Sequence, residues 1–343
     1  MAADLRAVPP RNPLENIREE IETNELYKEF RDNVDLVDKY CHTRGTFGGL
    51  DMGFPQMTEA LEGLQPGIIL IAGQPNVGKS AIVLQMALQV AQSNDKVYCM
   101  YHSIDDNIKE MLPRAAATLA RVPINQIKFP QKLEQEGQIR ALERRARALQ
   151  EIKQLSSRFG IRDSLYNGEG ADIEAIEHSV KHMRMSLPED VKICLFIDNF
   201  HDLNSKTITR TESEAKRYEY ICDKLTSMAN NYDMPIVCSA ELKKLNGTRR
   251  PTAEDVRESV KIAYEAKAIL LCYNEVGLKG EAANVYWDDP SREGKQPVLE
   301  VHFGKNKLSS FKGRLFYNFW PEMSRLEEVG KEGSNVHRAK IHY

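Results

Sequence analysis

The residues best suited to chemistry lie in the stretch GQPNVGKS at 73–80, which has the spacing G-x-x-x-x-G-K-S. The apolar run IILIA precedes it and the helical pattern AIVLQMALQVAQ follows it, which is the strand, loop and helix context that a phosphate-binding loop requires. Gly73 and Gly78 allow the backbone to curl with its N–H groups toward phosphate oxygens, and the start of the helix adds its positive dipole end. In the nucleoside triphosphate site that this predicts, Lys79 would neutralise the terminal phosphates and Ser80 would ligate Mg²⁺. The residues between the glycines that we expect to line the nucleotide are Gln74, Pro75, Asn76 and Val77.

Acidic residues end two other strand-like runs. In LFIDNFHDL, Asp198 follows apolar residues, so we expect its carboxylate beside the phosphate loop in the Mg²⁺ shell. Asp202 is the alternative, and a turn-capping role competes. In YCMYHSIDDN, Asp105 or Asp106 could orient the attacking water, because the carboxyl ends of parallel strands line the ligand crevice. A helix N-cap is the competing interpretation, since DDNIKEML begins a helical pattern, and we favour Asp105 as the functional residue.

A sheet must position these side chains, and the chain carries the pattern of one. Short continuous apolar runs alternate with longer helical patterns, which indicates a parallel sheet covered on both faces. The runs are IILIA at 68–72, VYCMY at 97–101, ICLFID at 193–198, PIVCSA at 235–240 and AILLCY at 268–273. Two later runs, VLEVHF at 298–303 and RLFYNFW at 314–320, flank the basic loop GKNKLSSFKG and predict an antiparallel hairpin. The predicted fold class is therefore α/β, with a mainly parallel central sheet, flanking helices and a C-terminal antiparallel hairpin.

Composition limits the class of protein. At 343 residues, with 41% hydrophobic and 28% charged residues, the chain fits one large core or one core plus a small appendage. No apolar run approaches the roughly 20 residues of a spanning helix, and the start lacks a signal-peptide core, so we expect a cytoplasmic protein with no membrane partner. Six cysteines without metal-ligand spacing predict buried free thiols. With a net charge of -3, any contact with nucleic acid requires a local basic surface.

The two ends of the chain have signatures of their own. In residues 1–45, Asn12 and Pro13 begin an acidic helical pattern with a narrow apolar stripe. This helix either packs on its own domain or forms an arm that packs on a neighbouring subunit. Residues 46–328 hold all the motifs above, and the polar tail at 329–343 is expected to be frayed.

The order of these motifs resembles the carboxyl-terminal motor domain of DnaB-type replicative helicases, within the RecA-like ATPases, from about residue 44 to 328. The most specific segments are LQPG before the phosphate loop, RES at 257–259 and the GK that opens the last hairpin. The resemblance implies a P-loop NTPase that forms a homo-hexamer or other ring, with ATP between subunits and single-stranded DNA in the channel. The family's linker helix, which docks on the adjacent subunit, corresponds to the N-terminal helix and favours the arm interpretation. Replication proteins would be further partners.

Residue by residue, the resemblance implies roles at the nucleotide. The phosphate-loop glycines, lysine and serine fall on the family's Walker A positions, and Asp198 falls on its Walker B aspartate. Asp105 falls where the family usually has a catalytic glutamate, so its carboxylate is one methylene shorter. Glu241, in CSAELKK, falls where a glutamine normally senses the γ-phosphate. In GKNK, Lys305 and Lys307 fall on the residues that a neighbouring subunit supplies, the second of which is usually arginine, a bidentate donor.

Two basic loops fall where the resemblance implies contact with DNA. They are NSKTITRTES at 204–213, with Lys206 and Arg210, and KKLNGTRRP at 243–251, with Arg249 and Arg250. Cations beside hydroxyl groups suit sequence-independent contacts with phosphates. A solvated loop is the competing interpretation of each.

The main hypothesis is an ATP-dependent DNA helicase or translocase of the hexameric DnaB-like type, and therefore an ATP hydrolase. The alternative is a RecA-like regulatory ATPase that switches rings or filaments without unwinding, which the departures at Asp105, Glu241 and Lys307 favour. A GTPase is disfavoured because NKLS at 306–309 lacks the aspartate of the guanine-reading pattern. A small-molecule kinase is disfavoured because no segment suggests an acceptor pocket or a lid.

Overall fold

The computed structural model describes residues 24–43, 48–164, 171–208, 213–256 and 260–341. The chain divides into two compact units, Met1–Gly48 and Gly49–Tyr343. The expectations for Asn12, Pro13, Arg210 and the RES stretch at 257–259 lie outside the described residues.

The described part of the first unit is one helix, α2 (Glu25–Thr43), as the apolar stripe predicts. Three apolar side chains on the stripe are exposed, Phe30 by 68%, Val34 by 50% and Val37 by 56%. Residues spaced by four and three positions share one face of a helix. The helix therefore carries an apolar face that is open to solvent, and the arm interpretation stays a prediction.

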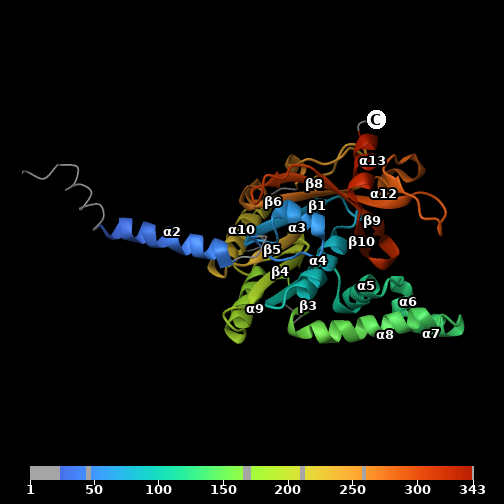
Figure 1. Ribbon diagram of the computed structural model, residues 1–343, viewed down its shortest axis with the longest axis horizontal. Helices are drawn as coiled ribbons and strands as arrows, with labels where there is room; N and C mark the ends of the chain where they lie inside the picture. The colour runs from blue at the N-terminus through green and yellow to red at the C-terminus, as the bar shows by residue number, and fades with distance from the viewer. Residues whose placement is uncertain (1–23, 44–47, 165–170, 209–212, 257–259, 342–343) are drawn as a thin grey trace, which may run out of the picture. The chain divides into compact units, whose positions relative to one another are not determined.

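The second unit is built on a sheet of ten strands within the described residues, in the order β10-β9-β8-β6-β1-β5-β4-β2-β3, with β7 paired to β8 (Figure 1). The strands are β1 (Gly67–Gly73), β2 (Val97–Ser103), β3 (Phe159–Asp163), β4 (Lys192–Asp198), β5 (Pro235–Glu241), β6 (Ala268–Asn274), β7 (Tyr286–Trp287), β8 (Gln296–Asn306), β9 (Arg314–Trp320) and β10 (Arg325–Glu328). The neighbouring strands β6, β1, β5, β4, β2 and β3 pair in parallel. Beyond β6, the strands β8, β9 and β10 extend the sheet with antiparallel pairing. The predicted fold class, a mainly parallel sheet with a C-terminal antiparallel hairpin, is confirmed.

Helices cover both faces of this sheet (Figure 1). They are α3 (Pro55–Leu61), α4 (Lys79–Ser93), α5 (Ile108–Ala120), α6 (Ile124–Lys128), α7 (Pro130–Gln135), α8 (Ile139–Gln154), α9 (Ile173–Ser186), α10 (Glu214–Asn231), α11 (Val260–Glu265), α12 (Glu275–Lys279) and α13 (Lys331–Ile341). One core cluster joins α3 and α4 to alternate strand residues, and a second joins α9, α10 and α11 to the other face. This explains why the central strands are apolar throughout, since both of their faces are buried.

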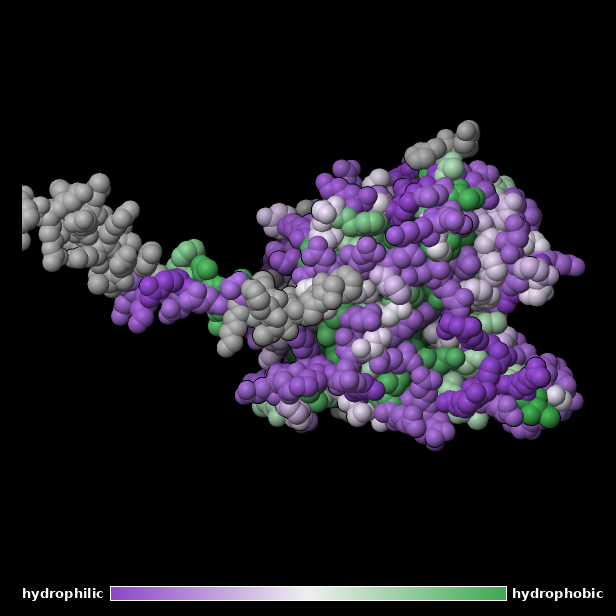
Figure 2. Space-filling view, viewed as in Figure 1, coloured by the Kyte–Doolittle hydropathy of each residue, from purple (hydrophilic) through white to green (hydrophobic). Residues whose placement is uncertain are grey.

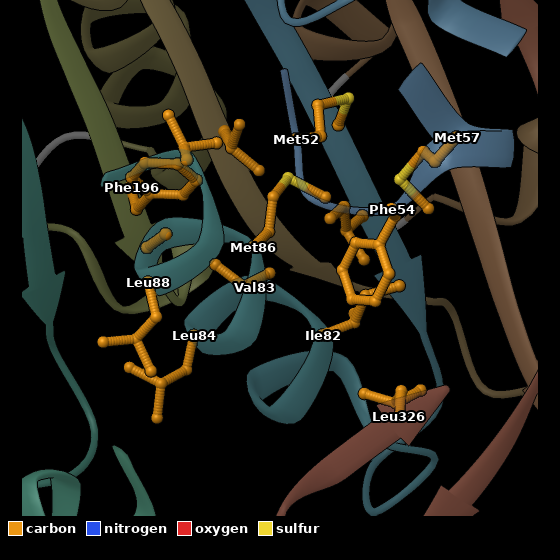
Figure 3. Close-up of a cluster of buried hydrophobic side chains, with 14 of the residues drawn as sticks. Met52, Phe54, Met57, Ile82, Val83, Leu84, Met86, Leu88, Phe196 and Leu326 are labelled. Atoms are coloured by element: carbon orange, nitrogen blue, oxygen red, sulfur yellow. The ribbon is translucent and has the colours of Figure 1, made fainter. Parts of the chain in front are cut away.

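Helix α4 is the centre of the first core cluster. Figure 3 shows its side chains packed with Met52, Phe54 and Met57, and against Phe196 of β4 and Leu326 of β10. The helix that begins at the phosphate loop is thereby held on two sides by segments far apart in the sequence. A rigid helix keeps its N-terminus, and thus the loop before it, in one place.

Three strands and one helix differ from the sequence expectations. Strands β3, β7 and β10 were not predicted, because they are short, contain polar residues and lie away from the centre of the sheet. The tail expected to be frayed instead forms α13. Its His337 is buried with its ring 5.4 Å from that of Phe316, and Ser334 donates a hydrogen bond of 3.1 Å to the carbonyl of Val329. A few buried contacts are enough to order a helix whose overall composition is polar.

The remaining expectations concern thiols and membranes. Cys99, Cys194, Cys222, Cys238 and Cys272 are buried and free, as predicted, whereas the side chain of Cys41 is not described. Figure 2 shows a largely hydrophilic surface on the visible face of the second unit. Among the described helices, none combines the length and the apolar character that crossing a bilayer requires.

Candidate functional site

The phosphate loop occupies the turn between β1, which ends at Gly73, and α4, which begins at Lys79. Gly78 has a φ of 113°, a left-handed conformation that favours glycine. A Cβ added at Gly73 would lie 2.7 Å from Cγ2 of Val77, so that position also has no room for a side chain. The loop therefore leads into the free N–H groups at the start of a fifteen-residue helix, which is a favourable site for a phosphate.

Lys79 reaches back across this loop. Its Nζ donates a hydrogen bond of 3.0 Å to the carbonyl oxygen of Gln74. Burial lowers the pKa of Lys79, while the neighbouring Cys272, Asp198 and Glu241 act in the opposite direction. The ammonium group is thus partly desolvated, and an anion in the loop would find it poorly screened by water.

Asp198 ends β4 and is buried. The hydroxyl of Tyr101 donates to its Oδ2 at 2.9 Å, and the hydroxyl of Ser239 donates to its Oδ1. Burial and the nearby Asp198 raise the pKa of Tyr101 well above its usual range, so that hydroxyl keeps its proton. Neither Tyr101 nor Ser239 is predicted from the sequence, where the one signal of their role is a hydroxyl inside an otherwise apolar run.

The carboxyl ends of the parallel strands meet at one edge of the sheet, which we call the phosphate edge. Gly73 lies opposite Glu241 of β5, and Asp198 lies opposite Ser103 at the end of β2. Asp202, four residues beyond Asp198, accepts a hydrogen bond of 3.0 Å from Asn199. Partial burial and the charges of Asp105 and Glu241 raise the pKa of Asp202. The structure therefore brings the predicted acidic residues together with the phosphate loop.

Asp105 is exposed in a bend after β2. The N-cap of α5 is Asn107, whose side chain accepts a hydrogen bond of 2.9 Å from the backbone N–H of Lys109. Asp106 instead forms an ion pair of 2.7 Å with Arg114. The competing N-cap interpretation is therefore wrong for both aspartates, and the role of Asp105 in orienting water stays a prediction.

His201 links two parts of the phosphate edge and was not predicted. Its Nδ1 accepts a hydrogen bond of 3.1 Å from the backbone N–H of Glu241, so that nitrogen carries no proton. The ring is buried between Phe200 and Tyr218, with centroids 5.3 and 5.6 Å away. The segment after Asp198 thereby holds the end of the next strand, from which Glu241 projects.

The oxygen donors present fit Mg²⁺. Ser80 and Asp198 would supply a hydroxyl and a carboxylate, the ligands this hard cation prefers, alongside phosphate oxygens and water. Within the described residues, no group of three or more His, Cys, Asp or Glu side chains could hold a metal by itself. Any Mg²⁺ at this edge would therefore depend on the nucleotide for part of its coordination.

An open cavity of about 670 Å³ adjoins the loop. It is lined by Gln74, Pro75, Glu241, Leu242, Lys243, Lys244, Leu245 and Leu278. The start of the phosphate loop and the segment after β5 thus line one open cavity, and a ligand held by the first would lie near the second.

Lys305 and Lys307, which were expected to act on a neighbouring subunit's nucleotide, do not lie at the phosphate edge. Lys305 pairs with Ile269 near the start of β6, whereas Gly73 is level with Cys272 near the end of that strand. Its Nζ donates to the carbonyl oxygens of Ala263 and Tyr264 at 2.7 and 2.6 Å. Burial, and then the charge of Lys307, lower the pKa of Lys305 to about 8. The structure does not bring these lysines together with the phosphate loop of the same chain.

Tyr264 marks this second region, which we call the lysine edge. It is 72% exposed, and the Nζ atoms of Lys305 and Lys307 lie 5.8 and 5.5 Å from its ring centroid. Both distances suit cation–π contacts. The two lysines therefore stand at a solvent-facing surface beside an exposed aromatic ring.

The loop that carries Lys206 is anchored at its start. Glu174 accepts hydrogen bonds from the hydroxyl of Ser205 at 2.6 Å and from the backbone N–H groups of Lys206 and Thr207 at 3.1 and 3.2 Å. Although burial opposes the effect, these bonds lower the pKa of Glu174 to about 2. The side chain of Lys206 is exposed, so the anchored backbone presents it to solvent.

Arg249 and Arg250 both have acidic partners within the chain. Arg249 donates to the two carboxylate oxygens of Asp255 at 2.7 and 2.6 Å. Arg250 donates to Glu300 at 2.8 and 2.6 Å and to Glu275 at 3.2 Å. The prediction that these arginines contact DNA stays untested, and the ion pairs count against it, most strongly for Arg250.

The sequence pattern of a family described as the DnaB-like helicase C terminal domain matches residues 49–327. The replicative DNA helicase DnaB of Haemophilus influenzae is 21% identical over 305 residues, covering 88% of this chain and 59% of that protein. The protein of the same name from Leifsonia xyli is 23% identical over 271 residues, covering 78% of this chain and 54% of that protein. The chain therefore spans about half the length of the curated relatives it matches.

Two solved structures share the fold. One, described as an ATPase domain, has a TM-score of 0.73 at 19% identity and covers 88% of this chain and 98% of its own. The other is a DnaB-like replicative helicase described with its interactions with primase, with a TM-score of 0.71 at 19% identity, covering 88% of this chain and 66% of its own. At this identity the likeness concerns the RecA-like fold alone.

Proposed function

The chain belongs to the family of DnaB-like helicase C-terminal domains, and from this premise we propose that it is the ATP-hydrolysing motor of a ring-shaped DNA helicase or translocase. The observation that carries the proposal is that Lys305 and Lys307 lie near the start of β6, whereas the phosphate loop lies near the opposite end of the strands. On this proposal, one chain holds two half-sites, one near each end of the strands in this sheet. Copies arranged head to tail would complete each site, and such contacts form a ring when the rotation between neighbouring copies closes.

At each such interface, the phosphate edge of one subunit would hold ATP with Mg²⁺. The loop N–H groups and Lys79 bind the β- and γ-phosphates, and bound Mg²⁺ would neutralise charge on the same oxygens. Asp105 orients the water that attacks the γ-phosphorus, and Asp198 accepts from Tyr101 and Ser239 so that its carboxylate stays fixed. The neighbour's Lys305 and Lys307 would stabilise charge that develops on the transferred phosphoryl group.

Glu241 has a different requirement. A carboxylate facing a phosphate repels it unless a cation lies between them. Lys243 and Lys244 line the same cavity as Glu241, and either ammonium could bridge the carboxylate to the γ-phosphate. We assign Glu241 to sensing the γ-phosphate through such a bridge.

For DNA we propose Lys206 and Arg210, with Arg249 as a further contact through the half of its side chain that is exposed. The names of the relatives, replicative DNA helicases, support DNA as the substrate. Contacts of this kind neutralise phosphates and weaken as salt increases. The ring, the N-terminal arm and a replication partner such as primase, together with a place in the cytoplasm, belong to the same proposal.

The second candidate is a RecA-like regulatory ATPase that switches assembly without unwinding. Asp105, Glu241 and Lys307 favour it, because each departs from the residue that the resemblance implies for fast hydrolysis. The names of the relatives favour the helicase.

The test is ATP turnover of the full chain with and without a single-stranded oligonucleotide, together with strand displacement on a forked duplex. A helicase should show stimulated turnover and displacement, and Lys79→Ala should abolish both. Stimulation without displacement would point to a translocase, and neither effect would point to the regulatory ATPase and contradict the main proposal.

A further inference from the structure

A buried ion-pair cluster lies behind the loop that was expected to contact DNA. Glu300 of β8 is fully buried and accepts two hydrogen bonds from the guanidinium of Arg250, with Arg314 at 3.5 Å. Glu275 is 1% exposed and pairs with Arg250 and, at 2.6 Å, with Lys279. A buried charge of this kind requires its partner, so Arg250 has little freedom to leave Glu300 for a DNA phosphate.

The geometry of Arg250 is fixed on its remaining side. Its guanidinium carbon lies 4.7 Å from the ring centroid of Tyr273, and the hydroxyl of Tyr273 donates a hydrogen bond of 2.6 Å to the carbonyl of Thr248. Stacking and a two-pronged pair with a carboxylate are properties of arginine that lysine does not share. The loop around 248–250 is therefore tied to β6 and β8 at a defined position.

Strand β8 contacts the segment after this loop at two more levels. A Cβ added at Gly304 would lie 3.3 Å from Cβ of Ala253, so the two backbones approach closely there. Lys305, the next residue, donates to the carbonyl oxygens of Ala263 and Tyr264. The strand that carries the lysine edge is thus in contact with both ends of the stretch from Arg250 to Tyr264.

The base of the same loop is attached to the phosphate edge. The backbone N–H of Lys243 donates to the carbonyl of Asp255 at 2.7 Å, and Leu242 forms a bridge with Val256. Both contacts begin directly after Glu241, at the end of β5. One continuous set of bonded groups therefore runs from Glu241 through the loop and Arg250 to Glu300 and Lys305.

We propose that Arg250 is a positioning residue that couples the 243–251 loop to strand β8, so that DNA bound near the loop changes the placement of the lysines offered to the neighbouring subunit. This inference rests on the proposed function and replaces a direct DNA contact by Arg250. Packed side chains and hydrogen-bond networks transmit coupling when they connect elements that move as units. The ion pair of Arg250 with Glu300 is the contact that links the 243–251 loop to strand β8.

The experiment compares the wild-type chain with the double variant Arg250→Gln/Glu300→Gln and with Arg250→Lys. The double variant removes both charges of the pair and leaves Glu275 paired with Lys279, so that Arg314 is the one cation of the cluster that loses its carboxylate. The control is Arg292→Gln, which removes an arginine paired with Asp289 and Glu322 outside this cluster. Anisotropy of a labelled oligothymidine with a non-hydrolysable ATP analogue gives the Kd for DNA. Titration of ATP turnover with the same oligonucleotide gives the maximum stimulation, and thermal melting confirms folding.

We expect the double variant to keep its DNA Kd within about threefold while its maximum stimulation falls about tenfold, the usual size of an allosteric coupling. Arg250→Lys should recover part of the stimulation, and Arg292→Gln should match the wild type. A weaker DNA Kd with full stimulation at saturating DNA would identify Arg250 as a DNA contact and overturn the proposal, as would no change in either quantity. If the double variant does not fold, Arg250→Lys, which keeps a cation opposite Glu300, carries the same comparison.

The wild-type measurement separates this inference from the function on which it rests. If single-stranded DNA does not stimulate wild-type turnover at any concentration, the proposed motor function fails, and the coupling role fails with it. If wild-type turnover is stimulated and the Arg250 variants are stimulated equally, only the coupling role is wrong.

Discussion

The phosphate edge and the lysine edge of the sheet differ in how their polar groups are held. At the phosphate edge, Asp198 is buried and accepts hydrogen bonds from Tyr101 and Ser239. At the lysine edge, Lys305 donates to two backbone carbonyl oxygens, and the neighbouring ring of Tyr264 is largely exposed. The first region is organised by the fold itself, whereas the second is presented to solvent.

This difference indicates how the two regions would share a reaction. Groups that bind a substrate gain most when they are fixed beforehand, because no reorganisation is needed as charge develops. A cation supplied across an interface acts on the substrate only when the partner subunit is in place. Under the proposed function, the phosphate edge would be the binding half of a site, and the lysine edge would complete the site of a neighbouring subunit.

The largest expected effect comes from breaking each half separately and then mixing the two variants. Lys79→Ala and Lys305→Ala should each lower ATP turnover by about 100-fold or more, the loss typical of a removed electrostatic stabiliser. Only Lys305→Ala should still bind a fluorescent ATP analogue. Mixed assemblies contain interfaces with an intact Lys79 on one side and an intact Lys305 on the other, so mixing should restore part of the turnover. Absence of recovery, in assemblies shown to exchange subunits, would place both lysines in one chain's site.

A smaller effect concerns pH. The pKa of Lys305 is lowered to about 8 by burial and by Lys307, and only the protonated ammonium can stabilise phosphate charge. The value of kcat/KM should therefore be highest below this pKa and fall as pH rises through it, to about a tenth at about pH 9. Lys305→Arg, whose side chain stays charged, should remove this alkaline decline whatever its absolute rate. An unchanged profile in that variant would show that another group titrates.

The smallest expected effect tests the preorganised edge. Asp105→Glu lengthens the carboxylate by one methylene and should raise turnover about threefold, because the longer side chain reaches the attacking water more easily. Asp105→Asn is the matched control and should lower turnover instead. If glutamate lowered the rate and asparagine left it unchanged, Asp105 would have no part in orienting water.

Much of the fold could be predicted because its signals are local and repeated. The central strands form continuous apolar runs, and the predicted runs at 68–72 and 235–240 match β1 and β5 within one residue at either end. Strands β3 and β10 could not be found in this way, since their residues become strands only by pairing with β2 and β9. The tail was misjudged for a similar reason, because two buried side chains, not its composition, order α13.

The residues of the candidate site also fall into a group that local sequence predicts and a group that depends on the tertiary structure. Lys79 and Asp198 could be predicted because motif spacing and strand ends mark them. Tyr101, Ser239 and His201 could not, because their role depends on which strands are neighbours in the sheet. Arg249 and Arg250 look equivalent in the sequence, yet the side chain of Arg250 is 19% exposed and pairs with the fully buried Glu300, whereas that of Arg249 is 48% exposed and pairs with Asp255.

The sequence by itself determined the phosphate loop, the parallel sheet and the family. Each of these depends on residue types and apolar periodicity within short continuous segments of the chain. Only the tertiary structure decided that Lys305 lies at the edge opposite the loop and that Arg250 faces a buried carboxylate. Both positions depend on strand order and register, which bring together residues about 50 to 230 positions apart. Such long-range pairing leaves no signal in the local sequence.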